Sequence, residues 1–282
     1  MNYFPDLDGD IDRWFAEDIG EGDHTTLGTI PAEVSGAAIL LAKEAGIIAG
    51  IAVAAQIFHR MDGDLKLEPA LEDGKAMSAG DTVFRITGKV HSILQCERLV
   101  LNVMQRMSGI ATTTREYVKL VEGTGARVTD TRKTTPGLRM LEKEAVRLGG
   151  GTNHRSGLYD MILIKDNHID YAGGLKPAIR AVLNYLKARD LDLRIEVETR
   201  SPDEVAEVLS IGGVDRILLD NFTVDQTREA VKLVHRRYET ESSGGITRET
   251  IRSYAECGVD YISVGALTHH IRSLDLSLKA KF

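Results

Sequence analysis

Basic side chains gather in three short clusters between residues 127 and 169. The clusters are Arg132/Lys133, His154/Arg155 and Lys165/His168. The first and third follow short apolar runs, and the second lies in a glycine-rich loop between them. Strands of α/β folds end at a common edge, where side chains and loops build ligand sites. The sequence therefore predicts an anion-binding site at the ends of these strands.

From residue 127 onward the chain alternates between apolar strands and helices. The predicted strands are 127–130, 161–164, 194–197, 216–219, 238–242 and 261–264. The polar or glycine residues that follow four of them, Glu198, Asp220, Ser243 and Gly265, are 22, 23 and 22 residues apart. One β/α unit per step favours a parallel β/α barrel, whose functional groups lie at the carboxyl ends of its strands. Six strands are fewer than eight, so the barrel is expected to be open or incomplete.

The predicted rim of this barrel contains groups of both charges. The planar fork of an arginine such as Arg132 or Arg155 suits carboxylate and phosphate groups. Glu198 and Asp220 stand alone on apolar strands, so they either pair with the cations or bind a divalent metal carried by a phosphorylated substrate. Ser243-Gly244-Gly245 is either an ordinary turn or a phosphate-binding loop before a helix capped by Thr247.

Helix signals accompany this pattern. Pro136 marks the start of one helix, and Ser201 and Thr223 are predicted N-caps of two others. Before about residue 110 we expect a small mixed α/β domain. Its predicted parts are a helix over 1–20, a polar loop over 17–26, β-type segments over 35–53, a strand over 82–90 and a helix over 92–107. Arg98 and Arg106 lie off the apolar stripe of the last helix. The pattern alone therefore predicts that both arginines are exposed to solvent.

Composition narrows the class of ligand. The chain has 282 residues and a net charge of -7, which disfavours a general nucleic-acid role. No apolar run has membrane-spanning length, and four aspartates within the first 12 residues argue against a secretion signal. Cys96 and Cys257 show no metal spacing and are expected to be buried thiols in a reducing cytoplasm. An acidic protein that concentrates cations in one region points to a small anionic ligand.

The motifs within this pattern resemble those of the quinolinate phosphoribosyltransferase family along nearly the whole chain. They are GDHTT (22–26), ERLVLN (97–102), SGIAT (108–112), DTRKTTPGLR (130–139), GGGTNHR (149–155), LIKDNH (163–168), EVE (196–198), LDN (219–221) and SGGI (243–246).

The resemblance implies a fold and an assembly. An N-terminal α/β sandwich domain would cover 1–110, an open, incomplete parallel β/α (TIM-like) barrel would cover 111–269, and the tail 270–282 would pack back on the first domain. The family works as a homodimer or a larger homo-oligomer, in which Arg98 would complete the site of the partner.

The resemblance also implies roles for the site residues. Arg132, His154, Arg155 and Lys165 would hold the two carboxylates of quinolinate, with Thr131 beside them as a further substrate-binding residue. Lys133, Glu198 and Asp220 would be the catalytic residues, facing phosphoribosyl pyrophosphate and its magnesium. Ser243, Gly244, Gly245 and Gly265 would hold the 5′-phosphate.

The implied reaction gives nicotinate mononucleotide, carbon dioxide and pyrophosphate in NAD biosynthesis. Three alternatives remain open. A phosphoribosyltransferase for nicotinate or another related pyridine carboxylate would need fewer cations. The molybdenum-associated relatives share the fold but lack the Asn-His-Arg and Lys-Asp-Asn-His motifs. A non-catalytic sensor of a phosphate ligand would gain nothing from Glu198 and Asp220.

Overall fold

The computed structural model describes residues 7–281, which divide into two compact units. The described residues of unit 1 are 7–115, 136–150 and 270–281, and those of unit 2 are 116–135 and 151–269. Helix α4 (Val90–Leu120) begins in unit 1, and its last residues belong to unit 2.

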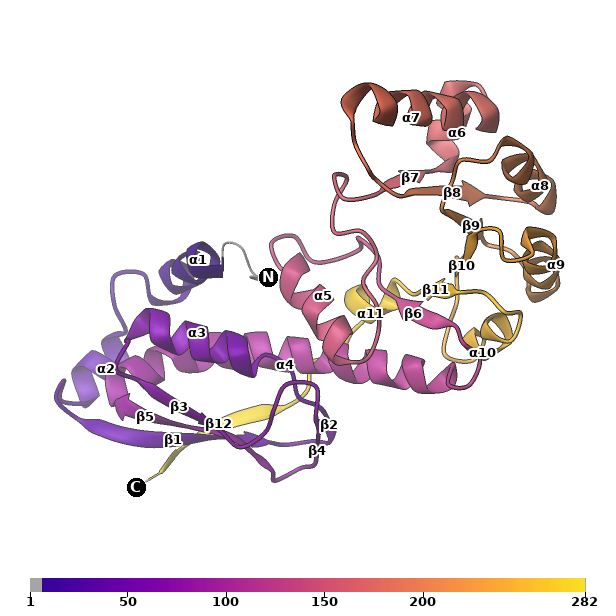
Figure 1. Ribbon diagram of the computed structural model, residues 1–282. Coiled ribbons are helices and arrows are strands. Elements are labelled where there is room, and N and C mark those ends of the chain that lie inside the picture. Colours follow the sequence, from indigo (N-terminus) through magenta and orange to yellow (C-terminus); the bar gives the residue numbers. More distant parts are fainter. Residues whose placement is uncertain (1–6, 282) are drawn as a thin grey trace. The chain divides into compact units, whose positions relative to one another are not determined.

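Unit 1 is built on an antiparallel sheet with the strand order β12-β1-β5-β3. The strands are β1 (Ser35–Ala42), β3 (Lys66–Pro69), β5 (Thr82–Lys89) and β12 (Leu276–Lys281). Helices α3 (Ile51–Met61) and α4 lie along one face of this sheet (Figure 1). The ring of Phe58 on α3 meets Phe84 on β5 edge-on at 6.0 Å between centroids. The remaining elements are α1 (Leu7–Ile19), α2 (His24–Thr29), and the short pair β2 (Gly46–Ile47) and β4 (Ala76–Met77).

The C-terminal tail supplies a strand to this sheet. Strand β12 pairs with β1 in a register that runs from Ala37↔Lys281 to Ala42↔Leu276. Gly109, inside α4, is the point of closest approach between helix and tail, since a Cβ there would lie 2.3 Å from the carbonyl oxygen of Arg272. Glycine normally weakens a helix, but here the packing of the tail requires it. Helix α4 continues past its predicted end at 107.

Three local predictions for the N-terminal part need correction. The expected β-type segment 35–53 ends in the first turn of α3, whose buried residues Val53, Ala54, Ile57 and Phe58 follow helical spacing. Part of the expected polar loop 17–26 is helical, as the end of α1 and the start of α2. Of the helix expected over 1–20, residues 1–6 lie outside the described part of the chain.

Helix α5 (Arg139–Leu148) belongs to unit 1, although the predicted division assigned 111–269 to the barrel. It is held by Arg106 of α4, whose Nη2 lies 2.6 Å from Oε1 of the buried Glu142. Arg106 is thus an ion-pair partner of a buried carboxylate and not a solvated arginine. The helix begins at Arg139 with Leu138 as its N-cap, three residues after Pro136, which lies outside it.

Unit 2 contains a six-stranded parallel sheet in the order β6-β11-β10-β9-β8-β7. Figure 1 shows the strands in an arc with the connecting helices on its outer side. The strands are β6 (Arg127–Thr129), β7 (Ile162–Ile164), β8 (Ile195–Thr199), β9 (Arg216–Asp220), β10 (Glu239–Ser243) and β11 (Tyr261–Ser263). The helices are α6 (Asp166–Ala172), α7 (Leu175–Arg189), α8 (Pro202–Ile211), α9 (Val224–Val234), α10 (Ile251–Ala255) and α11 (Ala266–His269).

The predicted fold class, a sheet domain with an open β/α barrel of six strands, is confirmed. Two of the predicted N-caps are confirmed: the side chain of Ser201 accepts the N–H of Glu204, and Thr223 forms a capping box with Gln226.

Strand register carries the site residues to one edge of this sheet. Glu241 and Ser243 on β10 are Cα partners of Leu218 and Asp220 on β9, while Glu198 on β8 is also a partner of Leu218. Residues two apart on a strand share a face. The same face therefore presents successive layers of side chains from neighbouring strands.

Candidate active site

One pocket of unit 2, with a volume of about 730 Å³, collects the predicted site residues. It is lined by Thr131, Arg132, Lys133, His154, Arg155, Lys165, Glu198, Asp220, Ser243, Gly244, Gly245 and Gly265. The lining also includes Leu163, Leu218, Asn221, Glu241, Ile246, Thr247, Ser263, Val264, Ala266 and His269. The predicted site residues stand at or near the carboxyl ends of strands or in the connecting loops, as the sequence predicts. Of the other lining residues, Leu218 and Glu241 lie within β9 and β10, and Ala266 and His269 lie in α11.

The positive side of the pocket is formed by Arg132 and Arg155, with Lys165 near the carboxylates. Burial lowers the pKa of the Arg155 guanidinium, and the neighbouring charge of Arg132 lowers it further. Two arginines that repel each other in a desolvated place are stabilised when an anion binds between them. Arg155 is held by a hydrogen bond of 3.2 Å from Nη1 to the carbonyl oxygen of Met161.

The loop that carries His154 and Arg155 is tied to strand β6. Thr152 forms a parallel bridge with Thr129, and the backbone N–H of Asp130 donates to the carbonyl of Thr152. The Asp130 carboxylate in turn accepts the backbone N–H of His154 at 2.8 Å. These contacts place the loop in the gap between the two edge strands of the sheet.

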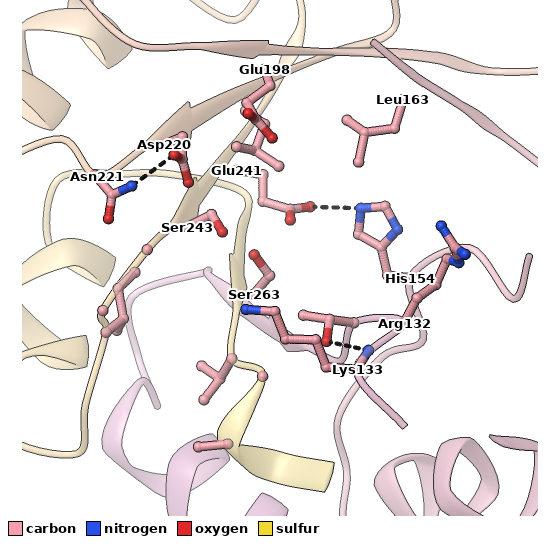
Figure 2. Close-up of a pocket in the computed structure, with 18 of the residues that line it drawn as sticks. Arg132, Lys133, His154, Leu163, Glu198, Asp220, Asn221, Glu241, Ser243 and Ser263 are labelled. Carbon is pink, nitrogen blue, oxygen red and sulfur yellow. Dashed lines mark hydrogen bonds and ion pairs between the residues drawn. The ribbon is translucent and has the colours of Figure 1, made fainter. Parts of the chain in front are cut away.

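The negative side of the pocket is formed by Glu198 and Asp220, which lie near Ser243 and Asn221 (Figure 2). Glu198 is buried and accepts a hydrogen bond of 3.0 Å from Lys165 Nζ, so the expected pairing of a rim carboxylate with a rim cation is present. Burial raises the pKa of Asp220, and the charge of Glu198 raises it further. Adjacent carboxylates that repel each other favour a cation, and their oxygen donors fit Mg²⁺.

Glu196 and Glu241 are fully buried, and Glu241 also lines the pocket. Burial raises the pKa of each carboxyl group to about 7. The charge of Glu196 raises the pKa of Glu241 further, whereas the positive charge of Arg216 lowers the pKa of both groups. Single ligand atoms of His154, Glu196 and Glu241 lie within 4.8 Å of one another. However, Arg216 Nη1 lies 2.7 Å from Oε2 of Glu241 and supplies the compensating charge, so we assign no metal to this cluster.

Gly244 and Gly245 form a tight loop after β10, with φ of +94° and +60°. Within the described residues, no hydrogen bond occupies their backbone N–H groups, which suit a phosphate. The predicted cap is wrong, because α10 begins at Ile251 and Thr247 instead starts a turn, accepting the N–H groups of Thr250 and Ile251 through its carbonyl. The anion-binding capacity therefore comes from the loop itself.

Replacing Gly244 by alanine is expected to displace this loop. A Cβ there would lie 2.2 Å from Oδ1 and 2.8 Å from the backbone N of Asn221, at a φ that disfavours L-residues. We expect KM for the phosphorylated substrate that the family resemblance implies to rise about tenfold or more, with a stability loss of about 1–3 kcal/mol. Gly258→Ala is the control: it has a similar φ of +89°, lies outside the pocket and has room for a Cβ. An equal rise in KM for both variants would contradict a local role of Gly244.

Lys133 is positioned by its backbone. Its N–H donates to Thr131 Oγ1 at 3.1 Å, and its carbonyl accepts from the buried Thr268 of α11 at 2.7 Å. Its side chain passes over Gly265, where a Cβ would lie 3.2 Å from Lys133 Cδ and 2.9 Å from His269 Nε2. Gly265 therefore leaves room for Lys133 and His269 to approach each other.

Two of the basic residues singled out in the sequence are not in this pocket. Arg98 belongs to unit 1 and is exposed on α4. His168 is exposed, and its Nδ1 accepts the backbone N–H of Lys165, so it helps to begin α6. Conversely, the sequence interpretation missed Glu241, Asn221 and His269. Position could have indicated Glu241, which stands two residues before Ser243 and thus on the same face of the strand.

Comparisons with known proteins agree along the length of the chain. The family model for the quinolinate phosphoribosyl transferase C-terminal domain matches residues 110–279, and that for the N-terminal domain matches residues 23–108. The chain belongs to the quinolinate phosphoribosyltransferase family.

Individual members of this family are similar over nearly the whole of this chain and most of their own length. Quinolinate phosphoribosyltransferase [decarboxylating] 1b of Nicotiana tabacum is 46% identical over 97% of this chain and 82% of its own. The chloroplastic nicotinate-nucleotide pyrophosphorylase [carboxylating] of Arabidopsis thaliana is 45% identical over the same shares. The crystal structure of NadC from Streptococcus pyogenes superposes with a TM-score of 0.92 at 38% identity, covering 98% of this chain and 97% of that one.

Proposed function

We propose that the chain transfers the phosphoribosyl group of phosphoribosyl pyrophosphate to the ring nitrogen of quinolinate, with loss of carbon dioxide. The products are nicotinate mononucleotide and pyrophosphate, within NAD biosynthesis. The names of the relatives support this activity. The observation that carries it is one pocket in which Arg132, Arg155 and Lys165 face a pair of carboxylates and a glycine loop.

Quinolinate carries two carboxylates, and the positive side of the pocket suits them. Arg132 and Arg155 would each bind a carboxylate. Lys165, which also pairs with Glu198, would orient the ring. This arrangement presents the ring nitrogen to the sugar as the nucleophile, so no serine or cysteine nucleophile is required. The protein then contributes chiefly by orienting the two reactants.

The negative side of the pocket suits the ribose and the leaving group. As the bond between C1 and pyrophosphate breaks, positive charge develops on the sugar ring, which Glu198 and Asp220 would stabilise. Lys133 would offset the charge of the leaving pyrophosphate, and the loop Ser243–Gly245 would hold the 5′-phosphate with Gly265. Magnesium bound with this substrate would neutralise part of the leaving-group charge, and Glu198 and Asp220 are the residues that fit it.

Loss of carbon dioxide follows from the same binding mode. Once the ring nitrogen carries the ribosyl group it is cationic, and this charge stabilises the carbanion left when the neighbouring carboxylate departs. Proton uptake at that carbon gives nicotinate mononucleotide. Arg132 and Arg155 would hold the ring in place during this step.

Arg98 is proposed to complete the pocket of a second copy of the chain in a homodimer. Its exposure on α4 is compatible with that role. Mixing inactive Arg98→Ala and Glu198→Gln proteins under subunit exchange should then restore about a quarter of the wild-type activity, since half of the dimers are hybrid and each hybrid has one intact site. No recovery, with exchange demonstrated, would mean that Arg98 acts within its own chain, and an active Arg98→Ala protein would mean that Arg98 has no role in the site.

Location is part of the proposal. In the part of the chain that is described, no helix is long and apolar enough to cross a membrane. We propose a cytoplasmic enzyme, on the basis of the acidic composition and the two buried free thiols Cys96 and Cys257. Fractionation of the source cells would test it.

The function is tested with purified protein, phosphoribosyl pyrophosphate and magnesium, and either quinolinate or nicotinate as acceptor. Nicotinate mononucleotide and carbon dioxide from quinolinate, with no product from nicotinate, are expected. Product from nicotinate alone would replace the proposal with a nicotinate-specific transferase. No product from either acid, with the protein folded, would favour a non-catalytic sensor.

A further inference from the structure

The interior of the barrel beneath the pocket is ionic, although barrel interiors are usually filled by branched apolar side chains. Glu196 of β8, Arg216 of β9 and Glu241 of β10 are 0%, 5% and 0% exposed. Glu196 and Arg216 are Cα partners on adjacent strands. The proposed reaction uses none of the three, and such a cluster is costly to bury unless its geometry serves a purpose.

The cluster connects Arg216 to the pocket through His154. Arg216 Nη1 lies 2.7 Å from Oε2 of Glu241, and that carboxylate is 3.6 Å from Nε2 of His154 (Figure 2 shows the last contact). The Oε2 of Glu196 lies closer to the same ring nitrogen, at 2.9 Å. Two carboxylates thus face Nε2 of one histidine that lines the pocket.

The other ring nitrogen of His154 defines the position of the proton. Nδ1 lies 2.7 Å from the backbone nitrogen of Arg155 in a hydrogen bond. A backbone N–H can only donate, so Nδ1 is the acceptor and carries no proton. The proton of the ring is therefore on Nε2, from which it is donated to Glu196. In this arrangement the imidazole is neutral.

A neutral His154 with both nitrogens engaged cannot serve as a cation for a carboxylate of the substrate. It can, however, determine where the next residue lies, because its Nδ1 accepts the backbone N–H of Arg155, while the backbone N–H of His154 donates to the Asp130 carboxylate at 2.8 Å. The guanidinium of Arg155 lines the pocket beside Arg132. The ring thus holds the backbone N–H of Arg155, while Nη1 of its guanidinium donates to the carbonyl oxygen of Met161.

We propose that His154 is a positioning residue, held as the neutral Nε2–H tautomer by Glu196 and Glu241, and that it orients Arg155 for the carboxylates of the ligand. This replaces the sequence-based expectation that His154 itself holds a carboxylate of quinolinate. Arg216 supplies the charge that keeps the two carboxylates in place. The choice of quinolinate as ligand rests on the proposed function, but the tautomer does not.

The tautomer can be measured on the wild-type protein by NMR with ¹⁵N-labelled histidine. The His154→Gln variant identifies the resonances of His154 among the eight histidines of the chain. We expect a protonated Nε2 and an unprotonated Nδ1, both without ligand and with saturating quinolinate. Protonation of both nitrogens in the quinolinate complex, or of Nδ1 in the free protein, would overturn the proposal.

Positioning is tested by binding calorimetry with quinolinate and, separately, with phosphoribosyl pyrophosphate. Glu196→Leu removes the acceptor of the Nε2–H and should weaken quinolinate binding about tenfold or more, while Glu196→Gln keeps an acceptor and should restore most of it. Binding of phosphoribosyl pyrophosphate should change by less than about twofold in both. Glu239→Gln is the matched control, because Glu239 also pairs with Arg216, at 3.1 Å, whereas the carboxylates that face His154 are those of Glu196 and Glu241.

The two proposals fail in different ways. If wild-type protein binds quinolinate but Glu196→Leu binds it equally well, or loses both substrates equally, the positioning role is wrong and the proposed function stands. If wild-type protein shows the expected tautomer but neither binds nor converts quinolinate, the proposed function is wrong. A Glu196→Leu protein that does not fold leaves the wild-type NMR result as the deciding measurement.

Discussion

Replacement of Arg132 by alanine is expected to raise KM for quinolinate about a hundredfold while the protein remains folded. A hydrogen bond to a charged group contributes about 1.5–3 kcal/mol, and tenfold in affinity corresponds to about 1.4 kcal/mol. A guanidinium that binds a carboxylate through two such bonds therefore accounts for an effect of this size. KM for phosphoribosyl pyrophosphate, which faces the other side of the pocket, should change much less.

The same substitution relieves a repulsion in the ligand-free protein, because the charge of Arg132 opposes that of Arg155. Measurement of Tm for Arg132→Ala separates a loss of quinolinate binding from a loss of stability. A large fall in Tm would mean that Arg132 has a structural role.

Arg200→Ala is the matched control for this experiment. Arg200 also follows a strand of the same sheet, but it lies outside the pocket, with Nη2 2.9 Å from Oε1 of Glu204 at the surface. Its removal should leave both KM values within about twofold. If Arg132→Ala behaves like Arg200→Ala, the assignment of Arg132 to a carboxylate of quinolinate is wrong.

The placement of the pocket could be predicted because it depends on a simple periodicity. Each apolar run from residue 127 onward ends in a polar residue or glycine, and parallel strands bring those ends to one edge of a sheet. That is why Lys165, Glu198, Asp220 and Ser243 could be expected in one site before any fold was known. Their chemical roles come from the family resemblance and not from the periodicity.

The ionic interior could not be predicted in the same way. Arg216 and Glu239 stand at the beginnings of strands, where a charged residue normally marks the edge of an apolar run exposed to solvent. The burial of Arg216 becomes evident only from the register, which sets it beside both Glu196 and Glu239. The tautomer of His154 likewise depends on a backbone contact that residue type does not reveal.

The contacts that place α5 in unit 1 could not be predicted for a related reason. Its amphipathic pattern predicts a helix but does not specify what the apolar face packs against. The deciding features are the ion pair of Arg106 with Glu142 and the close approach of Gly149, where a Cβ would lie 2.5 Å from the carbonyl of Ala111. Both are long-range contacts, which single-sequence patterns do not encode.

Replacement of Arg216 by methionine is expected to destabilise the protein by about 3–5 kcal/mol, because it leaves Glu196 and Glu241 buried without their cation. For a chain of this size that loss corresponds to a fall in Tm of about 10 °C. Arg216 also packs 3.8 Å over the ring of Tyr261, a contact that methionine only partly replaces. Differential scanning fluorimetry or calorimetry would measure the change.

The stability lost in Arg216→Met should be larger at high pH than at low pH. Both carboxylates have a pKa raised to about 7, and Arg216 lowers each pKa, so it stabilises them mainly when they are ionised. The Tm difference between wild type and Arg216→Met should therefore be larger at pH 8 than at pH 5, where the carboxylates are protonated in both proteins. A difference that is larger at pH 5 would contradict this account.

Two further variants separate charge from packing at Arg216. Arg194→Met removes another arginine that pairs with Glu239, but at a site where the arginine is 49% exposed, so it should cost no more than about 1 kcal/mol. Adding Glu241→Leu to Arg216→Met removes one of the two unpaired carboxylates and should recover part of the lost stability. If the double variant is as unstable as Arg216→Met at pH 8, the loss comes from packing against Tyr261 and not from uncompensated charge.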